Sequence, residues 1–75
     1  MNWLSRRRAR QEDAIVACLA DGEARTGYMI SQAIGRKSGT IFPTLARLEG
    51  DRRIISFWED PDGERPRRRL YRGVL

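Results

Sequence analysis

The 75-residue sequence contains no histidine and a single cysteine, Cys18. One cysteine cannot form a disulfide within the chain, and the usual imidazole and thiolate ligands of a zinc site are missing. A lone thiol fits a reducing compartment, so we predict a cytoplasmic, nucleoid-associated location. No metal, cofactor or small-molecule ligand is expected.

Long apolar runs are also missing, since the longest falls far short of the roughly 20 residues of a membrane helix. Acidic residues Asp21 and Glu23 interrupt the apolar segment after the basic residues 6–10, which argues against a secretory signal. The sequence has no glycine-rich phosphate loop, and the paired acids Asp60 and Asp62 fall in a turn. We therefore predict neither membrane binding nor enzymatic activity.

Lysine is scarce, because Lys37 is the only lysine among 15 cationic residues; all the others are arginine. The formal net charge is +5. Arginine can donate two parallel hydrogen bonds to a phosphate, which lysine cannot do. This balance predicts an anionic partner, for which nucleic acid, acidic lipid and acidic protein are the candidates.

The first helical pattern covers about residues 9–20. Ile15, Cys18 and Leu19 form an apolar stripe of helical period, and Gly22 follows where a helix can end. Continued toward the N-terminus, the same stripe becomes polar. We interpret Cys18 as a small core residue.

A second, short helix is predicted over residues 27–34, with Thr26 as its N-cap and Gly35 as the left-handed residue that ends it. Only Arg36 and Lys37 precede the next helix. Two helices joined by so short a turn containing glycine are typical of a helix-turn-helix unit.

The third helix occupies the segment 37–50. Its buried stripe is predicted to be Ile41, Leu45 and Leu48. In a helix-turn-helix protein the N-terminal part of this helix enters the major groove. The residues predicted to contact DNA here are Lys37, Ser38, Gly39, Thr40, Phe42, Pro43, Thr44 and Arg47.

Some of these positions allow a second interpretation. Ser38 and Thr40 can cap the helix as well as contact DNA, and Phe42 can pack into the core or face the groove. A loose helix start over residues 38–40, with Thr40 as the cap, would place Pro43 in the first turn, where a missing N–H costs little.

Two strands are predicted over residues 54–59 and 67–72, joined by the turn-forming residues 60–66. Residues 23–25 would supply a short third strand. The predicted fold is therefore α+β: a single winged helix-turn-helix domain over residues 1–75, with three helices followed by a two-stranded β-hairpin wing.

Four arginines crowd the wing: Arg65, Arg67, Arg68 and Arg69. Like charges at this density repel one another unless an anion lies near, which we expect to be a DNA phosphate. The alternatives are a charged strand edge that blocks aggregation, and neutralisation by Asp60, Asp62 and Glu64.

Residues 1–8 are predicted to form a basic extension, frayed because cations oppose the dipole at a helix N-terminus. Residues 6–10 are either a DNA-binding arm or a solvated face. Trp3 and Leu4 are candidates for covering the core edge or for a dimer contact.

From residue 15 to residue 71 the sequence resembles the winged-helix domain of PadR-type transcriptional regulators. The segment IVACLADGEARTGYMI matches the family at Gly27 and Tyr28, and SGTIFPTLARLE is similar to its Ser-x-Gly-Thr-Leu-Tyr-Pro-x-Leu-x-Arg-Leu-Glu segment. IISFWE and RPRRRLYR resemble the two wing strands, with Tyr71 matching.

The resemblance implies a DNA-binding repressor that acts as a dimer on a palindromic operator. It places Ser38, Gly39, Thr40 and Phe42 at the DNA-facing start of the recognition helix, and residues 67–69 on the wing. Phe42 stands where the family has tyrosine, and Arg52 where it has a helix-ending glycine. The family's C-terminal dimerisation helices are not in this sequence, so a homodimer is expected to form through another surface, such as Trp3 and Leu4.

We therefore predict a sequence-specific regulator of transcription that binds double-stranded DNA. Two alternatives stay open: a small architectural or excision factor for recombination, and a winged-helix module that binds protein.

Overall fold

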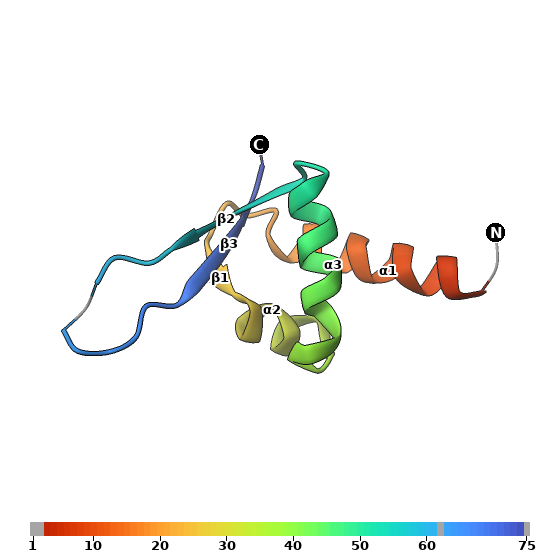
Figure 1. The fold of residues 1–75 in the computed structure, drawn as a ribbon. Coiled ribbons are helices and arrows are strands. Elements are labelled where there is room, and N and C mark those ends of the chain that lie inside the picture. Colours follow the sequence, from red (N-terminus) through yellow and green to blue (C-terminus); the bar gives the residue numbers. More distant parts are fainter. Residues whose placement is uncertain (1–2, 62, 75) are drawn as a thin grey trace.

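The computed structural model describes residues 3–61 and 63–74. Its elements are α1(Trp3–Cys18), β1(Arg25–Thr26), α2(Gly27–Ile34), α3(Ser38–Gly50), β2(Ile54–Trp58) and β3(Arg69–Gly73). The fold class is α+β, as predicted. The N-terminal half of α1 and the β2–β3 loop project from opposite ends of the molecule (Figure 1), whose longest dimension is 48 Å.

Helix α1 begins at Trp3, so the predicted start at residue 9 was wrong. Residues 3–8, expected to form an extension, are helical because they contain no glycine or proline and consist largely of helix-forming types. The helix ends at Cys18, and Gly22 adopts a left-handed conformation with φ 82°. Only the second half of α1 carries the apolar stripe, which is why its first half projects from the body.

The turn between α2 and α3 follows the prediction closely. The hydroxyl of Thr26 accepts a hydrogen bond from the N–H of Met29 at 3.1 Å, which caps α2. Gly35 has φ 72°, and the N–H of Arg36 bonds back to the carbonyl of Ser31 at 2.9 Å. The Thr26 cap fixes the start of α2, and the Gly35 conformation with the Arg36 hydrogen bond ends the helix abruptly. Helix α3 then begins at Ser38.

Helix α3 ends in the same way, but without a glycine. Arg52 adopts φ 60°, the N–H of Arg52 bonds to the carbonyl of Glu49, and the N–H of Arg53 bonds to the carbonyl of Leu48. This pair of hydrogen bonds defines a Schellman motif, which usually places glycine at the left-handed position. The chain turns there as a glycine-terminated helix would, with Arg52 in a strained conformation.

The sheet has three antiparallel strands in the order β1–β3–β2. The hairpin of β2 and β3 is confirmed, with Ser56 opposite Tyr71. The sheet is larger than the two-stranded hairpin named in the predicted fold, because β1 adds Arg25 and Thr26 opposite Tyr71 and Leu70. The third strand expected at residues 23–25 lies slightly later in the chain, and its two residues are too few to show a strand pattern.

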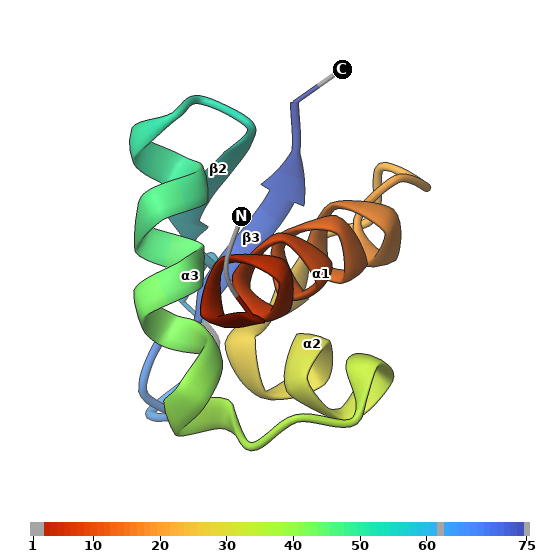
Figure 2. The ribbon, with the colours of Figure 1, turned by 90° about the vertical axis from the view of Figure 1, so that its right-hand side faces the viewer.

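The core lies where α1, α2, α3 and the sheet meet, and α1 packs against both α2 and α3 (Figure 2). The predicted stripe of α3 is confirmed, and Cys18 is partly buried against the core, consistent with a structural role. The buried hydrophobic residues are Ile15, Leu19, Ile30, Ile41, Leu45, Leu48, Ile54 and Tyr71.

Candidate nucleic-acid interface

The N-terminal end of α3 is exposed and lacks a side-chain cap. Lys37 occupies the N-cap position without a capping hydrogen bond, so the prediction that Ser38 or Thr40 caps the helix was wrong. The hydroxyl of Thr40 instead donates to the carbonyl of Lys37 at 2.7 Å. Lys37, Gly39 and Thr40 are exposed, and Ser38 is half-buried. The N–H groups of the first turn are therefore not occupied by a cap.

Pro43 lies in the second turn of α3, not in the first turn as predicted, because the helix begins as early as Ser38. A proline there removes the hydrogen bond to the carbonyl four residues earlier, that of Gly39. Both Pro43 and Gly39 are exposed, and no other atoms lie close to the position of a Gly39 side chain. Water can therefore solvate that carbonyl, and the front of α3 stays uncrowded.

Thr44 was predicted to be exposed, but only 5% of its surface is accessible. The buried arc of α3 is wider than its apolar stripe, because α1 also packs along this side. Arg47 is half-exposed, and its Nε donates to a carboxylate oxygen of Glu12 in α1 at 2.6 Å. Arg53 lies 3.8 Å from the same carboxylate. Arg47 therefore links α3 to α1.

Phe42 does not pack into the core, which was one of its two predicted positions; that it faces a DNA groove stays a prediction. Its side chain is 47% exposed, and the edge of its ring lies against Gly27, the first residue of α2. A shallow hollow lies beside it, lined by Phe42, Gly27, Tyr28 and two wing arginines, Arg68 and Arg69, among others. Phe42 thus joins α3 to the wing through a surface that combines aromatic rings and guanidinium groups.

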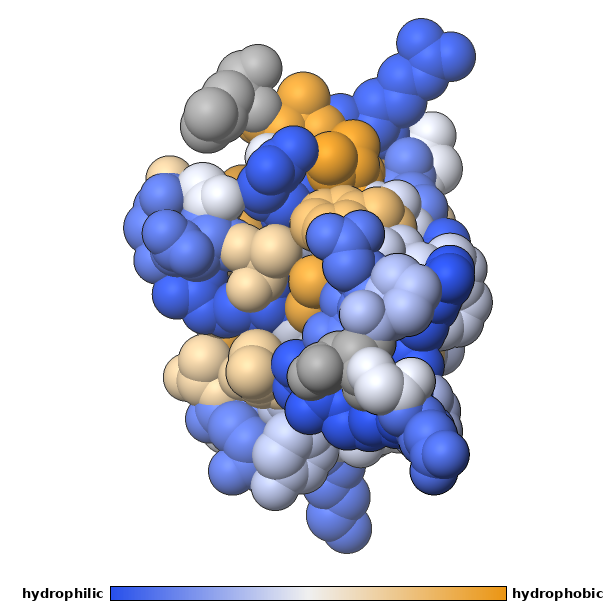
Figure 3. Space-filling model, turned by 90° about the vertical axis from the view of Figure 1, so that its left-hand side faces the viewer, coloured by the Kyte–Doolittle hydropathy of each residue, from blue (hydrophilic) through white to orange (hydrophobic). Residues whose placement is uncertain are grey.

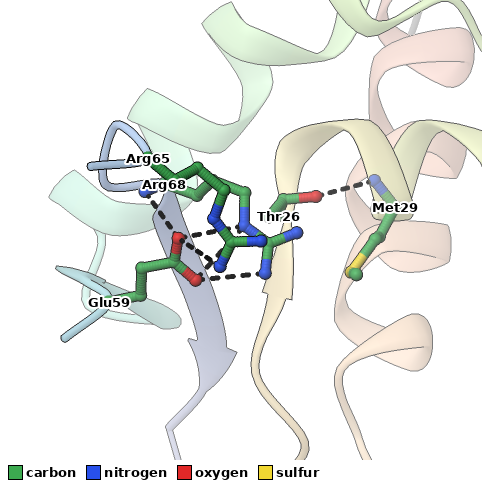
Figure 4. A network of polar contacts seen from close by, with 5 residues as sticks. All are labelled: Thr26, Met29, Glu59, Arg65 and Arg68. Carbon is green, nitrogen blue, oxygen red and sulfur yellow. Dashed lines mark hydrogen bonds and ion pairs between the residues drawn. The ribbon is translucent and has the colours of Figure 1, made fainter. Parts of the chain in front are cut away.

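Two of the wing arginines converge on one carboxylate, that of Glu59 (Figure 4). Arg68 donates from Nε and Nη2 to Glu59 at 3.1 to 3.2 Å, and the backbone N–H of Arg68 donates at 3.0 Å. Arg65 lies 3.6 Å from the same group. Hydrogen bonding from Arg68 is the main cause that lowers the pKa of Glu59 below its ordinary value. The wing therefore carries its own counter-ion.

Sequence reasoning named different acids for this role: Asp60, Asp62 and Glu64. Asp62 lies outside the described residues, so its part in this prediction stays a prediction, and Glu59 is a neutralising carboxylate that the prediction did not name. The signal was available, because antiparallel pairing places Glu59 across from Arg68, where the N–H of Glu59 bonds to the carbonyl of Arg68 at 2.9 Å. A prediction of the hairpin register would have found it.

The other two wing arginines differ in their surroundings. Arg69 donates to the hydroxyl of Ser56 at 2.7 Å, lies 3.6 Å from Glu49 and stacks 5.3 Å from the ring centre of Trp58. Arg67 is exposed to solvent, as the other three wing arginines are.

Arginines of α1 border the other side of α3. Arg7 and Arg8 line a hollow together with Pro43 and Arg47. Arg7 also borders a second hollow with Arg36, next to the start of α3. The amide of Gln11 donates to the carbonyl of Thr40 at 3.2 Å and holds α1 against α3.

Sequence reasoning left Arg36 out of the site and considered Arg7 and Arg8 only as part of a DNA-binding arm over residues 6–10, with a solvated face as the alternative. The signal for the α1 arginines was the polar first half of the α1 stripe. The apolar half of this stripe packs against the body of the protein, so its polar half lies on the same side of the helix, toward α3.

Trp3 is 65% exposed, and the guanidinium of Arg7 stacks 4.9 Å from its ring centre. The side chain of Leu4, the other predicted dimer residue, lies outside the described part of the structure. The predicted contact between copies at this end of α1 stays a prediction.

No helix in residues 3–61 or 63–74 combines the length and apolar character needed to cross a membrane. Across the same residues, acids and thiols do not gather into a group that could hold a metal ion. No known family model matches the sequence, and no curated protein matches it.

Proposed function

We propose that this chain is a winged-helix regulator of transcription that binds double-stranded DNA in a sequence-specific way, as a repressor. One observation carries the proposal. The uncapped, exposed front of α3 lies between two groups of arginines, Arg7 and Arg8 on the α1 side and Arg68 and Arg69 on the wing side. The PadR-type resemblance supports the same function and the repressor role.

In this proposal α3 enters the major groove by its N-terminal half. Gly39 and Thr40 present small side chains there, and Phe42 can contact a thymine methyl. The N–H groups of Ser38 and Gly39 in the first turn can donate to a phosphate oxygen, whereas that of Thr40 already bonds to the carbonyl of Lys37. The arginines on either side contact the two sugar–phosphate walls of the groove, which fixes the orientation of α3.

The ion pairs within the site do not oppose this function. Arg47 with Glu12 and Arg68 with Glu59 are partly exposed pairs, and such pairs are typically worth about 0–1 kcal/mol. A phosphate can therefore replace the carboxylate as the partner of each arginine. Until then the carboxylates limit repulsion among the arginines of the free protein.

The test is a fluorescence anisotropy titration of labelled duplex DNA at several salt concentrations, after selection of preferred sequences from a random pool. We expect affinity to fall steeply with salt and Arg68→Ala to weaken binding to all sequences alike. Arg72→Ala is the matched control. It removes the same single positive charge, but Arg72 stacks on Phe57 on the face of the sheet opposite to α3.

Absence of binding, or binding that salt does not weaken, would refute the proposal and favour a protein-binding module. Footprinting separates the two DNA-binding functions. One short symmetric site beside a promoter supports the regulator, whereas tandem sites along a recombination region support the architectural factor.

A further inference from the structure

Strand β2 is an edge strand with unpaired backbone groups. It lies at the end of the order β1–β3–β2, on the side of the sheet away from β1 (Figure 1). The N–H of Glu59 donates to the carbonyl of Arg68, and the carbonyl of Arg53 accepts from the N–H of Val74, the two residues that flank β3. Because these groups alternate along an antiparallel strand, the N–H and C=O groups of Ile54, Ser56 and Trp58 face the open edge.

The composition of this edge is unusual for a strand left in solvent. Edge strands exposed to solvent are commonly protected against pairing with another chain by lysine, proline or a charge within the strand. The five residues of β2, IISFW, include none of these, and Ile55 and Trp58 are 40% and 56% exposed. Within the described residues, no other backbone segment pairs with this edge.

The charges sit at the two ends of β2 and have opposite signs. Arg53 precedes the strand and Glu59 follows it, at equal distances from Ser56. When two such strands pair antiparallel with Ser56 opposite Ser56, Arg53 of each copy lies opposite Glu59 of the other. Directly opposed residues share a face and lie close together, so in each pair Arg53 joins the arginines that already contact the Glu59 carboxylate.

The same register matches the apolar residues. Ile55 then lies opposite Phe57 of the second copy, on the outer face of the sheet that α3 does not cover. In the single chain this face carries exposed hydrophobic side chains, Ile55 and Val74, which line one hollow. Figure 3 shows hydrophobic atoms gathered in the upper half of its view. A slip by one residue would bring Ile55 out of register with Phe57 and separate both charge pairs.

We propose that β2 is the contact between two copies of this chain, paired antiparallel about Ser56 into one continuous sheet. Because opposed residues share a face, α3 of both copies lies on the same side of that sheet. Such a dimer presents two recognition helices related by a two-fold axis, which suits a palindromic site. The dimer itself does not rest on the proposed function, since it requires no DNA.

The first test is sedimentation equilibrium of the full chain without DNA over a range of concentrations. We expect a monomer–dimer equilibrium that Ser56→Pro abolishes, because proline removes an edge-facing N–H that β3 does not use. Ser56→Ala is the matched control, since it removes the hydroxyl and keeps the N–H, and it should still form dimers.

The second test reverses single charges. Arg53→Glu and Glu59→Arg each place like charges opposite one another twice per dimer, so each should raise the dimer dissociation constant about tenfold or more. An equimolar mixture of the two variants restores both opposite pairs in the mixed dimer. We therefore expect the mixture to associate as the wild type does, while circular dichroism shows that each variant is folded.

Three results would overturn the proposal: a wild-type chain that stays monomeric, a dimer that Ser56→Pro leaves intact, or a mixture of the charge variants that does not associate. Large, open-ended assemblies would also overturn it, because they indicate unspecific edge pairing. DNA binding measured on the monomer decides the proposed function separately.

Discussion

The edge of the Phe42 ring in α3 meets Gly27, the first residue of α2. A β-carbon added to Gly27 would lie 2.9 Å from both Cε1 and Cζ of that ring, which is closer than two carbon atoms can approach. The ring can therefore approach α2 this closely only because residue 27 has no side chain. This contact sets the direction in which the Phe42 side chain points.

Gly27→Ala should displace the ring of Phe42 and lower DNA affinity by about 3–10-fold, because a misplaced contact at a groove loses about 1 kcal/mol. The free energy of unfolding should change by less than about 1 kcal/mol, since the exposed ring can move and alanine favours the helix. Thermal unfolding and anisotropy measure the two effects.

Gly50→Ala is the control for this substitution, because no atom lies near its added methyl group. It should leave DNA affinity unchanged. Equal losses of affinity in the two variants would show that the position of Phe42 does not matter.

Glu12→Gln should strengthen DNA binding. The carboxylate of Glu12 holds Arg47 at 2.6 Å, and the neutral amide would hold it less strongly. We expect DNA affinity to rise about 2–5-fold. The slope of the logarithm of the binding constant against the logarithm of the salt concentration should steepen by up to about 1, as for one added phosphate contact. Glu23→Gln makes the same change of net charge away from α3; an equal gain there would assign the effect to net charge alone.

Arg52→Gly should stabilise the protein by about 0.5–1 kcal/mol, because Arg52 occupies a left-handed conformation with φ 60° that costs a non-glycine residue energy. Urea unfolding monitored by circular dichroism measures the gain. Arg52→Ala keeps the strain and removes the charge, so it should bring no such gain. A stabilisation shared by both variants would point to charge and not to the backbone.

Stability should fall at acid pH through Asp21. Arg25 donates two hydrogen bonds to Asp21 at 2.9 and 2.7 Å, and this lowers the pKa of the carboxyl well below its ordinary value. A lowered pKa in the folded state means that the stabilisation is present above the unfolded pKa of about 3.9 and is lost as pH falls toward the folded pKa.

Unfolding curves recorded from pH 7 to pH 2 test this, with Asp21→Asn as the variant. The asparagine variant should be less stable at pH 7 and should approach the wild type as pH falls. Parallel profiles over the whole range would contradict the prediction and leave the decline to other carboxylates, such as Glu59, whose pKa is also lowered.

Local signals predicted the turn between the second and third helices well. A threonine cap, a glycine that tolerates a left-handed backbone and a buried stripe all act over a few residues, so they can be recognised in the sequence. The predicted roles of Thr26 and Gly35 and of the stripe on α3 are confirmed for this reason.

The candidate site was only partly predictable. Whether Thr44 is exposed depends on how α1 packs beside α3, and the partners of Arg47 and Arg68 lie far along the chain or across a hairpin. Charge counts showed that the arginines needed an anion, but they could not show that Glu12 and Glu59 already supply one.

By itself the sequence determined the α+β class, the helix-turn-helix spacing and the arginine-rich character, since each follows from local periodicity, capping chemistry and composition. Only the tertiary structure decided which way Phe42 points, which carboxylates hold the arginines and which edge of the sheet is open. Those outcomes depend on contacts between segments distant in the chain, and their geometry is set by packing, which no local pattern encodes.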